Sequence, residues 1–332
     1  MSFNDKLIIS GNINEELDLA QRSYDEQDFN QTIFHLGSAL ALEPNNQKVL
    51  IMLTTIFEKS LIDINTITLE NDDKVLWISN LTVVTYGFGY EKNYDHALVN
   101  LAKLLLLTEE TLYLYWLEDW LTDENFFTTL SFDALKKSLV HLLVLPNQAE
   151  FNHNIREIYE FFFKLLEKAE NYYDFDEQLM YIMAVLARRS LQFHKSIFIS
   201  AKSYGVKPSY FNTLALAYAY KELKDYDNTV RFFQEAINFR PDVIEAKLDL
   251  ADFLTARAIV LSEDFKKGVQ LYKDVVNINP HHSWAYPSYL CYSYILKLDG
   301  SLLDQLEKYA NDNPTNERAQ ELLLKAKLVK IN

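Results

Sequence analysis

A polar residue followed by an aromatic one recurs in this chain and opens the same pattern of small and large side chains each time. The pairs are Asp28-Phe29, Asn93-Tyr94, Asp225-Tyr226 and Asp264-Phe265. A small residue follows each aromatic by three positions, a large apolar residue by seven, and another apolar residue by ten. Offsets of three, seven and ten lie on one face of an α-helix. The pattern therefore predicts amphipathic helices, each with a small contact point near its start.

A second helix is predicted before each pair, and a proline after three of them. Fifteen positions after three of the aromatics stands a proline, which stops a helix and restricts the residue before it. In the fourth copy, five extra residues precede the pair, and we expect them to lengthen the first helix. The positions expected to hold the helix pairs together are Ala20, Phe29, Ala39, Pro44, Tyr94, Ala97, Ala217, Tyr226, Ala236, Pro241, Phe265, Gly268 and Pro280.

The prolines also reveal the length of the unit. Pro208, Pro241, Pro280 and Pro314 are 33, 39 and 34 residues apart, and a helix-turn-helix repeat of this kind has about 34 residues. Residues 13–46 and 210–280 resemble the tetratricopeptide repeat (TPR) family well. Residues 81–110 resemble it moderately, and 177–208 and 283–314 weakly. The resemblance implies an all-α superhelix of stacked helix pairs, an α-solenoid, whose first helices line a concave groove.

Three parts can be distinguished along the chain. Helical repeats are expected in 1–110, an irregular helical segment in 111–176, and TPR-like repeats with a capping helix in 177–332. The middle part is apolar at helical spacing without the small-residue pattern, so it is either diverged repeats or a helical insert. Gly and Pro number seven each, too few for a turn-rich β fold. We therefore expect more than roughly 65 % helix and essentially no sheet.

The composition also limits the partners. A net charge of −15 disfavours nucleic acid or an anionic membrane as the main partner, because both require a basic face. The charge is either a solubilising surface or an attraction for a basic partner. The single Cys291 fits a reducing compartment. We see no secretory signal and no uncharged apolar stretch long enough for a membrane span, and we expect a soluble cytoplasmic protein.

No catalytic residues, metal ligands or cofactor site are predicted. Gly87 and Gly89 lack the third glycine of a dinucleotide loop. Cys291 lies on a predicted helix, where burial is more common for cysteine than catalysis. Glu150 and His153 form a single Glu-x-x-His, half of a di-iron set. The pair His281-His282 lies in a predicted turn without further ligands.

The expected function is that of a non-enzymatic interaction scaffold or adaptor, binding a peptide segment or a partner helix in the groove. The alternatives are a peptide-sensing regulator and a non-catalytic subunit of a glycosyl- or methyltransferase complex. The resemblance places these residues on the groove wall: Phe211, Tyr218, Lys221, Glu222, Glu245, Asp252, Trp284 and Tyr294. The paired lysines and asparagines with which some family members clamp a terminal carboxylate are missing here. An aromatic wall with carboxylates suits a segment with apolar anchors and basic residues.

Overall fold

The computed structural model describes residues 11–69, 73–144 and 152–331. Of these residues, 77 % are helical, and no strand occurs among them. The expected helix content is thus confirmed. The chain divides into two compact units, Met1–Lys195 and Ser196–Asn332, and the boundary falls within one helix, α11 (Phe193–Val206). The three-part division at 110 and 176 stays a prediction.

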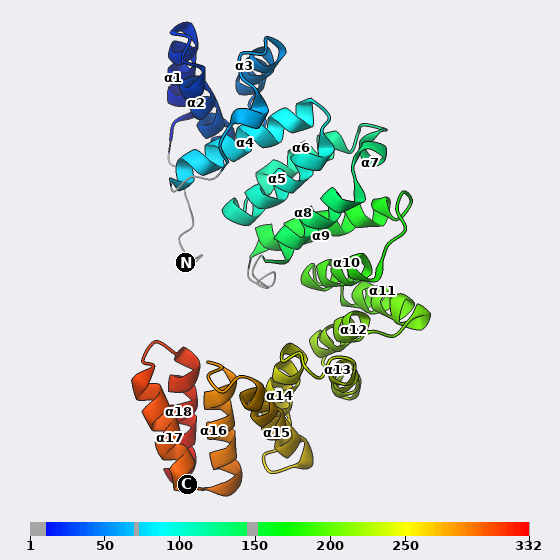
Figure 1. The fold of residues 1–332 in the computed structure, drawn as a ribbon, viewed down its shortest axis with the longest axis vertical. Coiled ribbons are helices and arrows are strands. Elements are labelled where there is room, and N and C mark those ends of the chain that lie inside the picture. The colour runs from blue at the N-terminus through cyan, green and yellow to red at the C-terminus, as the bar shows by residue number, and fades with distance from the viewer. Residues whose placement is uncertain (1–10, 70–72, 145–151, 332) are drawn as a thin grey trace. The chain divides into compact units, whose positions relative to one another are not determined.

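Helices of the first unit pack mainly against near neighbours along the chain, in some cases past an intervening short helix (Figure 1). Its helices are α1 (Ile13–Asp25), α2 (Phe29–Leu42), α3 (Gln47–Glu58), η1 (Ile64–Thr66), α4 (Lys74–Tyr90), α5 (Tyr94–Thr108), η2 (Thr111–Tyr113), α6 (Leu114–Trp120), α7 (Phe126–Thr129), α8 (Phe132–Leu143), α9 (His153–Ala169) and α10 (Glu177–Arg189). The main contacts join α1 to α2, α2 to α4, α4 to α5, α5 to α8 and α9 to α10.

The second unit repeats the helix pair more regularly. Its helices are α12 (Tyr210–Glu222), α13 (Tyr226–Phe239), α14 (Glu245–Arg257), α15 (Glu263–Ile278), α16 (Ala285–Lys297), α17 (Gly300–Asp312) and α18 (Glu317–Ile331). Each helix packs against the next, and α18 packs against both α16 and α17. The described chain is therefore an all-α helical-repeat solenoid, as the sequence predicts. On α18 the exposed positions include Leu324 and Leu328 as well as charged residues, so its outer face is less polar than expected of a cap.

The first three polar–aromatic pairs mark helix starts because the polar residue is the N-cap. Asp28 accepts a hydrogen bond from the Gln31 amide at 3.1 Å, and Asp225 accepts one from Asn228 at 3.2 Å. Such a bond satisfies an amide that has no partner inside the helix. The small residue three positions after the aromatic has a role too, since the Thr229 hydroxyl donates to the Asp225 carbonyl at 2.6 Å.

One residue in the left-handed conformation directly precedes each of these three N-caps, and another precedes Ser262, the N-cap of α15. These residues are Gln27, Lys92, Lys224 and Leu261, with φ between 58° and 71°. Left-handed backbone usually favours glycine. Because none of these four residues is a glycine, the sequence does not predict this turn. The predicted prolines do take their places: Pro44, Pro241, Pro280 and Pro314 each follow the residue that caps a helix end.

The fourth copy differs from its prediction in two ways. Its second helix starts two residues early, because Ser262 rather than Asp264 is the N-cap and accepts from the Phe265 amide at 3.2 Å. The extra residues do not lengthen the first helix, because α14 has 13 residues, the same as α12. They form the α14–α15 loop instead, where β-branched Ile259 and Val260 have low helix propensity.

The irregular segment packs onto the neighbouring repeats of the first unit. Because α5 contacts α8 directly, α6 and α7 form an excursion between them. The Trp116 indole N–H donates to the Pro44 carbonyl at 3.0 Å. The Trp120 ring lies so close to Gly89 that a Cβ there would be 2.4 Å from the indole nitrogen. The tryptophans of this segment are therefore core residues.

The core of the second unit tests the repeat register. Ala236 on α13 is fully buried within the apolar cluster that fills this unit. Replacing it with Leu should lower the free energy of unfolding by about 1–3 kcal/mol, because added volume forces the helices apart. Urea denaturation followed by circular dichroism measures this. Ala39 on α2 is also fully buried, so Ala39→Leu should have a similar effect, and an unchanged midpoint in both variants would contradict the register.

Candidate functional site: the first-helix face of the second unit

The first helices of the second unit carry a connected set of polar and aromatic side chains, which we call the first-helix face. Its members are Tyr218 and Lys221 on α12, Asp249 and Asp252 on α14, Trp284 and Ser288 at the start of α16, and Arg318 on α18. Asp249 and Asp252 are three positions apart, so they lie on the same side of α14. Asp249 joins α14 to the helix before it, and Asp252 joins α14 to helices that follow it.

Asp252 is the centre of the larger group. It accepts hydrogen bonds from the Trp284 indole nitrogen at 2.9 and 3.0 Å, and another from the Tyr272 hydroxyl. The Arg318 guanidinium lies 3.5 Å from one of its oxygens and 4.5 Å from the centre of the Trp284 ring. Arg318 also reaches the Ser288 hydroxyl at 3.4 Å. One carboxylate thus ties together α14, α15, α16 and α18.

Asp249 joins α14 to α12. The Tyr218 hydroxyl donates to its carboxylate, and the Lys221 ammonium lies 3.9 Å from the other oxygen. The ammonium also lies 6.0 Å from the centre of the Tyr218 ring, at the outer limit of a cation–π contact. These contacts hold Tyr218 and Lys221 against the neighbouring repeat.

The structure places the predicted groove residues unevenly. Phe211 and Trp284 are 40 % and 41 % exposed, Glu245 is exposed, and Tyr218 is half-buried. The prediction that Tyr294 projects from its helix is wrong, because its side chain is only 4 % exposed. At 3.6 residues per turn, ten positions rotate it by about 80° from Trp284, into the apolar cluster.

The other predicted residues of the groove wall are half-buried or already paired within the protein. Lys221 and Glu222 are half-buried at the end of α12. Asp252, expected as a carboxylate for a basic partner, is already paired with Arg318. Neither Asp249 nor Arg318 was predicted. The spacing of Asp249 and Asp252 is visible in the sequence, whereas nothing in it indicates that Arg318, 66 positions from Asp252, returns to the same group.

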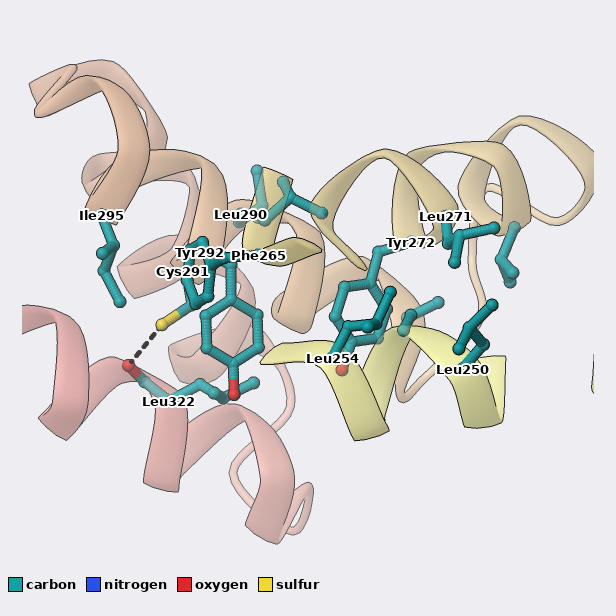
Figure 2. Close-up of a cluster of buried hydrophobic side chains, with 14 of the residues drawn as sticks. Leu250, Leu254, Phe265, Leu271, Tyr272, Leu290, Cys291, Tyr292, Ile295 and Leu322 are labelled. Atoms are coloured by element: carbon teal, nitrogen blue, oxygen red, sulfur yellow. Dashed lines mark hydrogen bonds between the residues drawn. The ribbon is translucent and has the colours of Figure 1, made fainter. Parts of the chain in front are cut away.

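The side chains of Cys291, Tyr272 and His282 take part in contacts inside the second unit. Cys291 is fully buried, and its thiol donates to the Leu322 carbonyl at 3.4 Å (Figure 2). Burial raises the pKa of the Cys291 thiol to about 12, so the nucleophilic thiolate is not formed near neutral pH. Burial and the charge of Asp252 raise the pKa of Tyr272 well above its usual value. His282 caps α16, since its Nδ1 accepts from the Trp284 and Ala285 amides at 3.2 Å.

Nowhere in 11–69, 73–144 and 152–331 do three His, Cys, Asp or Glu side chains gather as metal ligands would. Among the helices of the same ranges, none is long and apolar enough to cross a membrane. Glu150, one half of the Glu-x-x-His pair, lies outside the described residues.

Comparison with known proteins gives similarity at the level of structure but not of sequence. No family profile matches the sequence, and no curated protein matches it. Among solved structures, the chain is similar to the crystal structure of the TPR domain of P58(IPK), with 12 % sequence identity and a TM-score of 0.29. The similarity covers 96 % of this chain and 98 % of the other.

Proposed function

We propose that this protein is a non-enzymatic tetratricopeptide-repeat scaffold that binds a peptide segment or a partner helix on the first-helix face of its second unit. The observation that carries the proposal is that Trp284 is exposed and yet held in one orientation. Trp284 is 41 % exposed although Asp252 and Arg318 hold its ring in place from two sides. An exposed aromatic ring with a fixed orientation loses little conformational entropy on binding and so contributes strongly to an interface.

The neighbouring residues indicate the chemistry of the partner. Phe211 and Tyr218 are seven positions apart on α12 and so share one side of the helix. Together with Trp284 they offer aromatic surface to apolar anchors of a bound segment. The exposed carboxylate of Glu245 at the start of α14 favours a Lys or Arg in that segment. Such a charge contributes more to orientation and association rate than to affinity, and salt weakens it.

The test starts by finding a partner. Capture from an extract of the native host, with quantitative mass spectrometry, identifies proteins that the wild-type chain retains. A stable enzyme, a single peptide-bearing protein or a mixed set would point to a complex subunit, a peptide-sensing regulator or an adaptor, respectively. The binding segment is then made as a purified peptide for calorimetry.

The double variant Trp284→Ala with Tyr218→Ala should lower affinity for that peptide at least tenfold, about 1.4 kcal/mol, while helicity is retained. The reason is the loss of both fixed aromatic surfaces. The matched control is Phe239→Ala with Ile278→Ala, since both side chains are exposed at the ends of second helices. Full binding by the folded double variant, or equal loss in the control, would place the site elsewhere.

A further inference from the structure

A pocket of about 400 Å³ lies in the first unit, whereas the proposed interaction surface belongs to the second unit. It is bounded by the segment around η1, by α4, by α5 and by α8. Its apolar lining includes buried Ile64 from η1 and buried Phe88 from α4. A pocket of this size with an apolar lining and a few polar groups has the general form of a small-molecule site.

The polar side of the pocket comes mainly from one face of α5. Asn100 and Lys103 line it at three-residue spacing, with Asp95 and His96 one turn earlier. Lys137 contributes from α8. Residues spaced by three, four and seven positions share a helix face, so these polar groups are presented together.

Asn100 brings an amide group to the wall of the pocket. It is 5 % exposed and lines the pocket from α5. An amide offers two N–H donors and one carbonyl acceptor. A ligand in the pocket can therefore accept a hydrogen bond from this amide.

The charges around Asn100 are positive on balance. Neither Lys103 nor Lys137 forms an ion pair within the ranges the structure describes. Burial, together with the charge of Lys103, lowers the pKa of His141 on α8. The positive charge of Lys103 on α5 therefore acts on the neighbouring helix as well. The opposing carboxylate, Asp95, already accepts the Ser131 amide at 2.6 Å with one of its oxygens.

We propose that this pocket binds a small organic anion, with a carboxylate or phosphate-ester head held by Lys103, Lys137 and the Asn100 amide. The compact apolar body of the ligand packs against Ile64 and Phe88. Two ammonium groups and an amide N–H suit an oxyanion because charge-assisted hydrogen bonds are the strong ones. This small-molecule site is independent of the proposed scaffold function, since it uses other residues in the other unit.

Three probes with the same ring test the head group. Calorimetry on the full chain compares benzoate, phenyl phosphate and neutral benzyl alcohol. At least one anion should bind about tenfold more tightly than the alcohol. Preference for benzoate identifies a carboxylate site and preference for phenyl phosphate identifies a phosphate site. Equal binding of all three, or no binding by either anion, overturns the proposal.

Substitutions then test the assigned residues. Lys103→Gln with Lys137→Gln should weaken anion binding about tenfold, whereas Lys48→Gln, an exposed lysine of the same unit, should not. Lys103→Glu with Lys137→Glu should lose the anions and favour benzylamine. Unchanged anion binding in both lysine pairs, with circular dichroism of the native protein, overturns the assignment.

The Asn100→Ala variant tests the amide separately from the lysines. Alanine removes the amide without adding volume, so the variant should bind the anion several-fold more weakly while its circular dichroism stays native. Unchanged anion binding by the folded variant overturns the role of Asn100 in the pocket.

Discussion

Replacing Gly37 with alanine should lower the free energy of unfolding of the first unit by about 1–2 kcal/mol. Gly37 lies on α2 where this helix crosses α4. A Cβ at this position would lie 2.4 Å from the carbonyl oxygen of Ser79 and 2.7 Å from its carbonyl carbon. Both are backbone atoms, so relief requires the two helices to separate. Overpacking of this kind costs about 1–3 kcal/mol or more, and the gain of about 1 kcal/mol in helix propensity offsets only part of it.

A polar contact makes this crossing more sensitive. The hydroxyls of Ser38 and Ser79 lie 3.0 Å apart and are both buried, so separating the helices also strains their hydrogen bond. Urea denaturation followed by circular dichroism measures the change in stability. The matched control is Gly205→Ala on α11, where nothing lies within 4 Å of the added carbon. That variant should be as stable as the wild type or gain up to about 1 kcal/mol; equal loss in both variants would contradict the crossing.

Replacing Asp252 with alanine should destabilise the second unit by about 2–3 kcal/mol. The change leaves the Arg318 guanidinium, the Trp284 indole N–H and the Tyr272 hydroxyl without their shared acceptor. Losing one partner of a buried ion pair costs about 3–5 kcal/mol. The value expected here is lower because the side chains of Arg318 and Asp252 are 15 % and 29 % exposed.

The control for Asp252 is an ion pair in solvent. Asp242 and Arg240 lie 3.1 Å apart with both side chains largely exposed, and exposed pairs contribute little to stability. Asp242→Ala should therefore leave the denaturation midpoint nearly unchanged. Asp252→Ala should in addition shift the fluorescence of Trp284, the one tryptophan between residues 196 and 332. An unaltered midpoint and an unaltered spectrum together would refute the central role of Asp252.

The repeat was predictable because its signals act over a few residues. Asp28 and Asp225 cap the helices that follow them, and Pro44 and Pro241 lie just past the helix ends. Capping and helix termination depend on backbone amides three or four positions away, so their sequence pattern survives in the fold. The small residues Ala236 and Gly268 are likewise buried at helix contacts, as their spacing indicates.

The positions of single side chains in the candidate site could be predicted only in part. Trp284 and Phe211 are exposed, but Tyr294 is buried, because a projected register does not state which side of α16 its neighbours cover. The α14–α15 loop shows the same limit. Its five extra residues were expected to extend a helix, and only the backbone reveals that α14 ends at Arg257.

The sequence by itself determined the helix pairs of this protein, their approximate boundaries and the identity of their buried small residues, because these depend on contacts within about one helical turn. Only the tertiary structure decided which side chains meet. Arg318 reaches Asp252 across 66 positions, and the pocket joins Ile64 of η1 to Lys137 of α8. Such contacts arise from the stacking of separate helices, and helix stacking is set by the packing of whole surfaces rather than by any local spacing.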